Sequence, residues 1–215
     1  MANLPGHALA QANTFVLVIT KLQKAKTMSK EKSEVYKRQE QLSAVYQKAP
    51  GKAWITDVAE VTGVNLADPF RSHVTINDEL SVHFPVGVHR AIGGDHDSPN
   101  SGDILCAALA CCFETTLRMI ANRLQIQLLH THVKALADVD VRGTLMISST
   151  VPVGFQSMRL EVEIMALPDN AKLIQALLAT AKHSCIVYQI ISKGTPIKVE
   201  MKVLDPIVEQ ASAAS

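Results

Sequence analysis

One long helix over residues 101–124 is the feature that most constrains how this chain folds. The segment SGDILCAALACCFETTLRMIANRL is rich in Ala, Leu and Met, which favour helices. Ser101 is a suitable cap, and Asp103 places a negative charge in the first turn, where the helix dipole favours one. Apolar or small residues recur at spacings of three and four, and they are Leu105, Ala108, Leu109, Cys112, Thr116, Met119 and Ile120. This pattern predicts a mostly buried helix with Cys112 at the middle of its apolar face.

The cysteines are the main candidates for chemistry. Three of the four, Cys106, Cys111 and Cys112, lie in this helix, and the fourth is Cys185. This clustering differs from that of a disulfide-stapled secreted domain, so we expect free thiols in a reducing compartment. Packing is the ordinary role of a Cys on an apolar helical face. Because Cys185 ends a second helical run over 169–183, however, the two helices can bring two thiols together as a reactive pair.

The remaining segments predict an α+β fold. Period-two alternation predicts strands at 54–62, 70–76, 79–86, 125–141, 158–165 and 196–203, with a hairpin turn at Asn77 and Asp78. Residues 1–50 are predicted to form an N-terminal helical extension, with helices at 8–24 and 29–46, and residues 51–215 the main domain. A Pro-Gly pair at 50–51 marks the boundary. The second of these helices is amphipathic, so we expect it to lie against the main body or a second subunit.

Composition argues against several classes of partner. The net charge is +1, with 21 Lys and Arg against 20 Asp and Glu, and aromatic residues are 4% of the chain. Nucleic acid and an anionic membrane are therefore not expected as partners. The apolar run 15–19 is too short to span a membrane and does not resemble a signal peptide, so we expect a cytoplasmic protein. The polar loop 87–100 is interpreted as a solvated loop, and neither a metal nor another cofactor is expected.

Two cysteine motifs carry a family resemblance. Asn100 to Phe113 aligns without a gap on a motif with an Asn-Pro-Glu opening, an Ala-rich helix and a Cys-Phe pair, and Cys185-Ile-Val aligns on a later Cys-Pro-Val. The chain thus resembles the family of osmotically inducible protein C and organic hydroperoxide resistance proteins (OsmC/Ohr) over roughly residues 53–205. The resemblance implies an OsmC-like fold, in which antiparallel sheets wrap around two central helices, and an intertwined homodimer.

The same resemblance implies a thiol-dependent peroxidase, a peroxiredoxin-like reductase of organic hydroperoxides. Cys112 would be the peroxidatic thiol and Cys185 the resolving thiol, with Cys106 as a less favoured resolving thiol. A dithiol reductant such as a lipoylated protein would reopen the Cys112–Cys185 disulfide. Because burial raises the pKa of a thiol, the mechanism needs a group that stabilises the thiolate.

In the family that group is an Arg held by the Glu of the first motif. Here the Glu position is Gly102, the neighbouring acid is Asp103, and Arg71 and Arg90 are both candidates for the Arg. Ile186 replaces the Pro of the second motif. Two other functions stay open. One is a protein that binds a small apolar ligand without catalysis. The other is a thiol redox sensor whose partner contact involves residues 1–50.

Overall fold

The computed structural model describes residues 32–63, 65–77, 79–194 and 199. In chain order the helices and strands are α2 (Glu34–Lys48), η1 (Pro50–Ala53), β1 (Ala59–Thr62), β2 (Ser72–Ile76), β3 (Val82–Val86), η2 (Arg90–Ile92), α3 (Ser101–Arg123), β4 (Leu128–Asp138), β5 (Ser157–Ala166), η3 (Pro168–Leu173), α4 (Ile174–Ser184) and α5 (Ile186–Lys193). The predicted helix 8–24 and, apart from Val199, the predicted strand 196–203 lie outside the described residues. The α+β class is confirmed.

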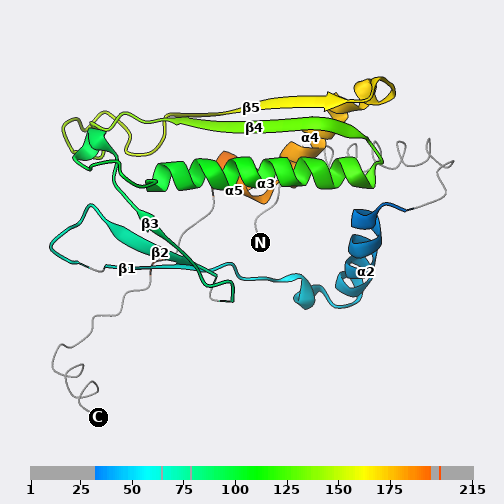
Figure 1. The fold of residues 1–215 in the computed structure, drawn as a ribbon, viewed down its shortest axis with the longest axis horizontal. Coiled ribbons are helices and arrows are strands. Elements are labelled where there is room, and N and C mark those ends of the chain that lie inside the picture. The colour runs from blue at the N-terminus through cyan, green and yellow to red at the C-terminus, as the bar shows by residue number, and fades with distance from the viewer. Residues whose placement is uncertain (1–31, 64, 78, 195–198, 200–215) are drawn as a thin grey trace, which may run out of the picture.

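Two separate antiparallel sheets flank the long helix. Strands β4 and β5 pair from Leu128↔Ala166 to Asp138↔Ser157, and this ribbon packs along α3. Strands β1, β2 and β3 form a three-stranded sheet, which Figure 1 shows on the opposite side of α3 from the ribbon. Helices α4 and α5 both pack against α3. Helix α4 corresponds to the second predicted central helix, and α5 follows it as a separate short helix.

The predicted hairpin is present, although its strands are shorter than expected. Strand β2 pairs with β3 from Ser72↔Val86 to Ile76↔Val82, while β1 begins only at Ala59 rather than at residue 54. Asn77 and Ser81 have positive φ angles of 51° and 50°, so the turn spans more than the predicted Asn-Asp pair. Residues 145–149 form turns, which matches the irregular return that the sequence leaves open there.

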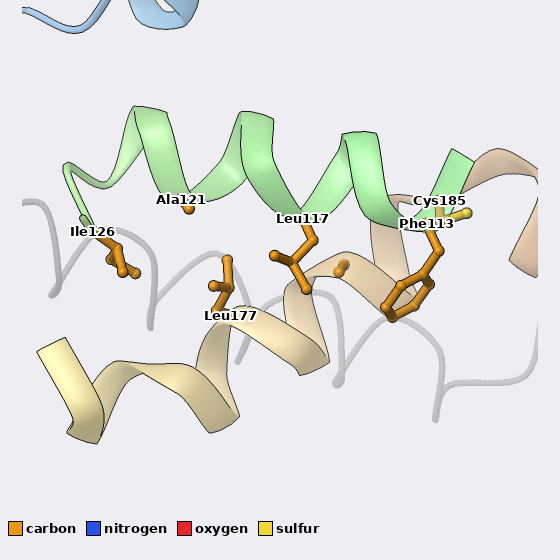
Figure 2. Packing of buried hydrophobic residues seen from close by; sticks show 7 residues of the cluster. Phe113, Leu117, Ala121, Ile126, Leu177 and Cys185 are labelled. Carbon is orange, nitrogen blue, oxygen red and sulfur yellow. The ribbon is translucent and has the colours of Figure 1, made fainter. Parts of the chain in front are cut away.

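Helix α3 has the predicted length, but its buried face differs from the prediction. The buried residues are Leu109, Phe113, Thr116, Leu117 and Ala121. Figure 2 shows Leu117 directed toward the segment that carries Leu177, and the centre of the Phe113 ring lies 6.2 Å from the centre of the Tyr188 ring. Leu105 is 36% exposed and Met119 is 37% exposed, so the predicted face, centred on Cys112, was wrong. The buried face is turned toward Phe113 because α4, α5 and β4 pack there, and Cys112 lies at its edge, only half-buried.

The N-terminus of α3 is capped one residue before the predicted cap. The Asn100 side chain accepts hydrogen bonds from the backbone N–H groups of Gly102 and Asp103, and the Asp103 carboxylate accepts one from the backbone N–H of Asn100. This reciprocal pair is a capping box. Ser101 is the first residue of the helix, so the prediction that it caps the helix was wrong. By length and composition α3 could cross a membrane, yet Phe113, Leu117 and Ala121 pack it into the core.

Helix α2 packs against the C-terminal half of α3, as expected for an amphipathic helix beside the main body. The backbone N–H of Val35 donates to Oδ1 of Asn122 over 3.1 Å, and Nη1 of Arg123 donates to Oε1 of Gln39 over 2.9 Å. The short helix η1 follows α2 at Pro50. That residues 1–50 form a unit distinct from residues 51–215 stays a prediction.

Candidate thiol site

The structure brings together the two cysteines that the sequence singled out. The Sγ atom of Cys185 donates to the Sγ atom of Cys112 over 3.2 Å, although 73 positions separate them in the chain. Cys112 comes from the middle of α3, and Cys185 comes from the junction of α4 and α5. Figure 2 shows Cys185 beside α3, close to Phe113. Cys185 is fully buried and Cys112 is half-buried, so solvent reaches the pair through Cys112.

A break between two helices places Cys185. The sequence predicts a single helical run over 169–183, but α4 begins at Ile174 and ends at Ser184, where Cys185 adopts an extended conformation with φ −76° and ψ 114°. The chain then re-enters a helix, α5, and the Cys185 sulfur caps it by accepting a hydrogen bond from the backbone N–H of Tyr188 over 3.4 Å. Both cysteines therefore lie at the N-terminus of α5.

This helix terminus stabilises a thiolate at Cys112. Burial raises the pKa of the Cys112 thiol. Four hydrogen bonds together lower it by more, so the net pKa is below the usual value of 9.0. They come from the backbone of Val187, the Cys185 thiol, the Thr116 side chain and the backbone of Ile186. The first N–H groups of a helix have no partner within the helix and carry its positive dipole end, which lowers thiol pKa values. The half-buried sulfur is thus the one favoured as a nucleophile.

The pKa of Cys185 is shifted in the opposite direction. Burial is the largest cause that raises its pKa, to about 11, and the hydrogen bond with Cys112 and the neighbouring charge on Cys112 add to the increase. At neutral pH Cys185 is therefore a protonated thiol, which can donate its hydrogen to the Cys112 thiolate. The pKa values of the two thiols are thus shifted in opposite directions although the sulfurs are 3.2 Å apart.

The N-terminus of α5 is the functional element that sequence reasoning missed. The sequence predicted a cationic side chain near Cys112, whereas backbone N–H groups of residues 186 and 187 supply positive partial charges there. One signal in the sequence could have indicated this helix start. The family's second motif has Pro directly after the Cys, and Pro is favoured at the first position of a helix. Ile186 occupies that first position here.

Arg71 lies in a separate acidic cluster. Its guanidinium bonds to the carboxylates of Asp68, Asp95 and Asp97, over 3.0 Å to Asp68 Oδ2 and 3.0 Å to Asp97 Oδ2. Arg90 donates from Nε to the backbone carbonyl of Asp95 over 3.3 Å. Within the described ranges, neither Arg forms a hydrogen bond or ion pair with Cys112. Both tie down the loop that precedes α3.

Asp103 is also separate from the sulfur pair. Its carboxylate completes the cap of α3, as described above, and lies 3.7 Å from Nε2 of His96. Nine residues separate Asp103 from Cys112, which is about 13 Å along the axis of a helix. The structure thus gathers Cys112 and Cys185 but neither Arg71 nor Asp103 beside them, and the catalytic roles of these two residues stay predictions.

Gly102 has a packing reason to be small. A Cβ atom on Gly102 would lie 2.9 Å from Oδ1 of Asn100 and 3.2 Å from Cζ of Phe155, which are distances too short for ordinary contact. Phe155 belongs to the segment between β4 and β5, which folds over the start of α3. The aromatic ring occupies space next to the position where the family places its Glu.

The other two cysteines have different surroundings. Cys111 is exposed, and Cys106 is half-buried with a pKa raised by burial and by the charge of Asp103. Among the contacts of the described residues, no hydrogen bond joins either of them to Cys112 or Cys185. The arrangement therefore favours Cys185 over Cys106 as the partner of Cys112.

A groove of about 550 Å³ leads to Cys112. Its walls come from α3, the start of α5 and helix α2, and it is lined by Gln39, Cys111, Cys112, Thr115, Thr116, Met119, Ile120, Arg123, Ser184 and Ile186. This volume lies within the usual range for small-molecule sites. A reactant of moderate size can therefore reach the half-buried sulfur.

Comparison with known proteins places this site in a family. Residues 94–200 match the sequence model of the OsmC-like protein family, a range that contains both cysteines. The chain is similar to the structure of an organic hydroperoxide resistance protein, OsmC, of Legionella pneumophila, with 25% identity and a TM-score of 0.50 over 65% of this chain and 90% of that one.

Two further structures share the fold at lower identity. An OsmC-like protein of unknown function from Vibrio cholerae has 10% identity and a TM-score of 0.54, over 66% of this chain and 96% of that one. An OsmC-like protein from Mycoplasma pneumoniae has 11% identity and a TM-score of 0.52, over 65% and 89%. No curated protein matches the sequence. Through the domain that contains the Cys112–Cys185 pair, the chain belongs to the OsmC-like protein family.

Proposed function

We propose that this protein is a thiol-dependent peroxidase that reduces organic hydroperoxides to alcohols. The observation that carries the proposal is the contact of Cys112 and Cys185 at 3.2 Å, with the pKa of Cys112 lowered and that of Cys185 raised. A thiolate is the nucleophile in such chemistry, and a second thiol 3.2 Å away is within reach to condense with the sulfenic acid that the first one forms. The similarity to an organic hydroperoxide resistance protein supports the same function.

The proposed reaction has three steps. The Cys112 thiolate attacks the terminal oxygen of the hydroperoxide, the O–O bond breaks, and the alkoxide takes a proton and leaves as an alcohol. The Cys185 sulfur then attacks the Cys112 sulfenic acid, which releases water and forms a disulfide. A dithiol reductant, for which a lipoylated protein is the class we propose, gives two electrons and two protons by exchange and becomes a disulfide itself.

Mass spectrometry of the protein after one equivalent of cumene hydroperoxide tests this proposal. We expect a rapid loss of two hydrogens and a peptide cross-link between Cys112 and Cys185. In Cys185→Ser the sulfenic acid should persist on Cys112 and be trapped by dimedone. Cys111→Ser is the matched control, because this neighbouring thiol is exposed and, within the described residues, forms no hydrogen bond with either sulfur of the pair. Unchanged thiols after prolonged exposure of the wild type would refute the proposal.

The source of thiolate activation separates two versions of the mechanism. The family resemblance assigns it to an Arg, for which Arg71 and Arg90 are candidates, with Asp103 as the supporting acid. The contacts of this chain favour the N-terminus of α5 instead. The pKa of Cys112 in Arg71→Gln separates the two versions, because only the version with an activating Arg71 requires that pKa to rise.

We also propose that two chains pair as a homodimer in the cytoplasm. Apolar side chains on and before the β1–β3 sheet support pairing, since Trp54 is 87% exposed and Val61 is 62% exposed. A second chain that covers these side chains would remove their apolar surface from water. Light scattering coupled to gel filtration should give twice the chain mass of 23.3 kDa, and a monomer at micromolar concentration would refute pairing.

A second candidate function is the binding of a small apolar ligand. A groove of about 820 Å³ lies between α3, β5, α4 and α5, and its lining includes Leu105, Phe113 and Leu178 but not Cys112. In this case the thiols serve only for packing. Slow alkylation of Cys112 at neutral pH, together with saturable binding of an apolar fluorescent probe, would favour binding over catalysis.

A further inference from the structure

We propose that Arg123, held by Gln39 of α2, is a specificity-determining residue that binds an anionic group on an elongated ligand whose other end reaches Cys112. The inference deepens the proposed peroxidase function and rests on it for the reaction, although binding alone can be tested without turnover. It assigns a role to α2, which lies outside the family match over 94–200.

The groove runs along one side of α3. Its lining includes Cys112, Thr116, Met119 and Arg123, which occupy positions i, i+4, i+7 and i+11 of the helix. Eleven residues rotate an α-helix to within about 20° of its starting direction and advance it about 16 Å. Cys112 and Arg123 therefore mark two ends of a single stripe, and Met119 provides apolar surface between them. A compact hydroperoxide occupies only one end of this stripe.

Helix α2 holds the Arg123 side chain at the groove. Oε1 of Gln39 accepts a hydrogen bond from Nη1 of Arg123 over 2.9 Å, and the Arg123 guanidinium carbon lies 5.7 Å from the centre of the Tyr36 ring. Nε2 of Gln39 also lies 3.9 Å from the Met119 sulfur. One glutamine of α2 thus contacts both the cation and the apolar centre of the stripe. Because these contacts already restrict the Arg123 side chain, it loses less conformational entropy when it binds a ligand.

Among the described residues, Arg123 differs from its cationic neighbours Arg118 and Arg38, which have acidic partners. Arg118 pairs with Glu114 at 2.6 Å, and Arg38 pairs with Glu34 at 2.8 Å. In the described part of the chain no carboxylate forms an ion pair with Arg123, and no lining residue of the groove is acidic. A guanidinium that keeps free N–H donors can bind a carboxylate through two parallel hydrogen bonds. The chemistry of the site thus fits a carboxylate joined to the peroxide by a linear apolar chain.

Paired substrates that differ only in charge test the inference. We would measure kcat/KM for ω-hydroperoxydodecanoate and for its methyl ester, which carries no charge, in wild type and in Arg123→Gln. We expect wild type to prefer the acid, and the acid-to-ester ratio to fall about tenfold in Arg123→Gln, which corresponds to about 1.4 kcal/mol. Arg38→Gln is the matched control, because it removes the same charge from the surface of α2 away from the groove. Gln39→Ala should lower the ratio in the same direction.

Binding of dodecanoate to Cys112→Ser, followed by calorimetry, separates the two proposals. If neither hydroperoxide is reduced but Arg123→Gln weakens dodecanoate binding in the Cys112→Ser background, the anion site stands and the peroxidase function fails. If both hydroperoxides are reduced with an acid-to-ester ratio that Arg123→Gln leaves unchanged, the peroxidase function stands and the role of Arg123 is refuted. Equal dodecanoate binding with and without Arg123 would refute it as well.

Discussion

Replacing Ile186 by Pro removes one backbone N–H from the N-terminus of α5 and tests whether this terminus activates Cys112. The N–H of Ile186 is one of the groups that lower the pKa of Cys112, and Pro has no N–H. Pro is well tolerated at the first position of a helix, and Cys185 before it already has the extended backbone that a residue preceding Pro adopts. The substitution therefore changes one hydrogen bond and leaves the path of the chain intact.

The magnitude follows from the strength of that bond. A hydrogen bond to a charged group contributes about 1.5–3 kcal/mol when it is well buried. Cys112 is half-buried and the N–H of Ile186 is the weakest of the contributors named, so we expect about 0.5–1 kcal/mol after solvent screening. At a pH below the pKa of Cys112, this energy lowers the thiolate population by about two- to fivefold. The pKa of Cys112 rises, because a donor to the charged form has been lost.

The assay is the rate of alkylation of Cys112 by iodoacetamide as a function of pH, in a background in which Cys106 and Cys111 are Ser. Ile186→Ala is the matched control, because it keeps the N–H and shortens a side chain that is 67% exposed. We expect the pH profile to move to higher pH in Ile186→Pro and to stay near wild type in Ile186→Ala. Identical profiles in the two variants would show that the N–H of residue 186 does not stabilise the thiolate.

Three further predictions concern stability, pH dependence and the acidic cluster. Leu117→Ala should lower the free energy of unfolding by about 2–5 kcal/mol, because Leu117 of α3 is fully buried in the core with Leu177 of α4. Leu105→Ala on the same helix should lower it by less, because Leu105 is exposed. Urea unfolding followed by circular dichroism compares the two, and equal losses would contradict the assignment of the buried face. The pKa of Cys185 is raised when folded, so its contribution to stability is complete below the unfolded value of 9.0 and is lost as pH rises through about 11. The stability of wild type relative to Cys185→Ala should therefore fall over that interval, and a constant difference would refute the raised pKa. Arg71→Gln should leave the pKa of Cys112 unchanged while it loosens the loop that holds Asp95 and Asp97, as proteolysis of that loop would report. A rise in the pKa of Cys112 in this variant would restore Arg71 as the activating cation.

Local sequence patterns predicted most of the secondary structure. The extent of α3, the hairpin of β2 and β3, and the long β4–β5 ribbon follow from periodicity and turn residues. The predictions that were wrong concern features that depend on how neighbouring elements pack. The apolar residues of α3 fit more than one face, and the packing of α4 and α5 selected the face through Phe113 rather than the one through Cys112. The end of the second helical run beside Cys185 was predicted, but the further helix α5 was not, because the short apolar run after Cys185 fits more than one kind of element.

The sequence by itself determined the family, the two cysteines and the helix that carries Cys112, because these depend on residue types at fixed local spacings. Only the tertiary structure decided how the sulfurs are activated. The approach of Cys112 and Cys185 to 3.2 Å depends on how α3 packs against the α4–α5 junction. The groups that lower the pKa of Cys112 include backbone N–H groups, which every non-proline residue carries. The position of Arg123 beside Gln39 likewise depends on the packing of α2 against α3. Contacts between distant segments are set by the packing of whole elements, and for that reason local spacing did not predict them.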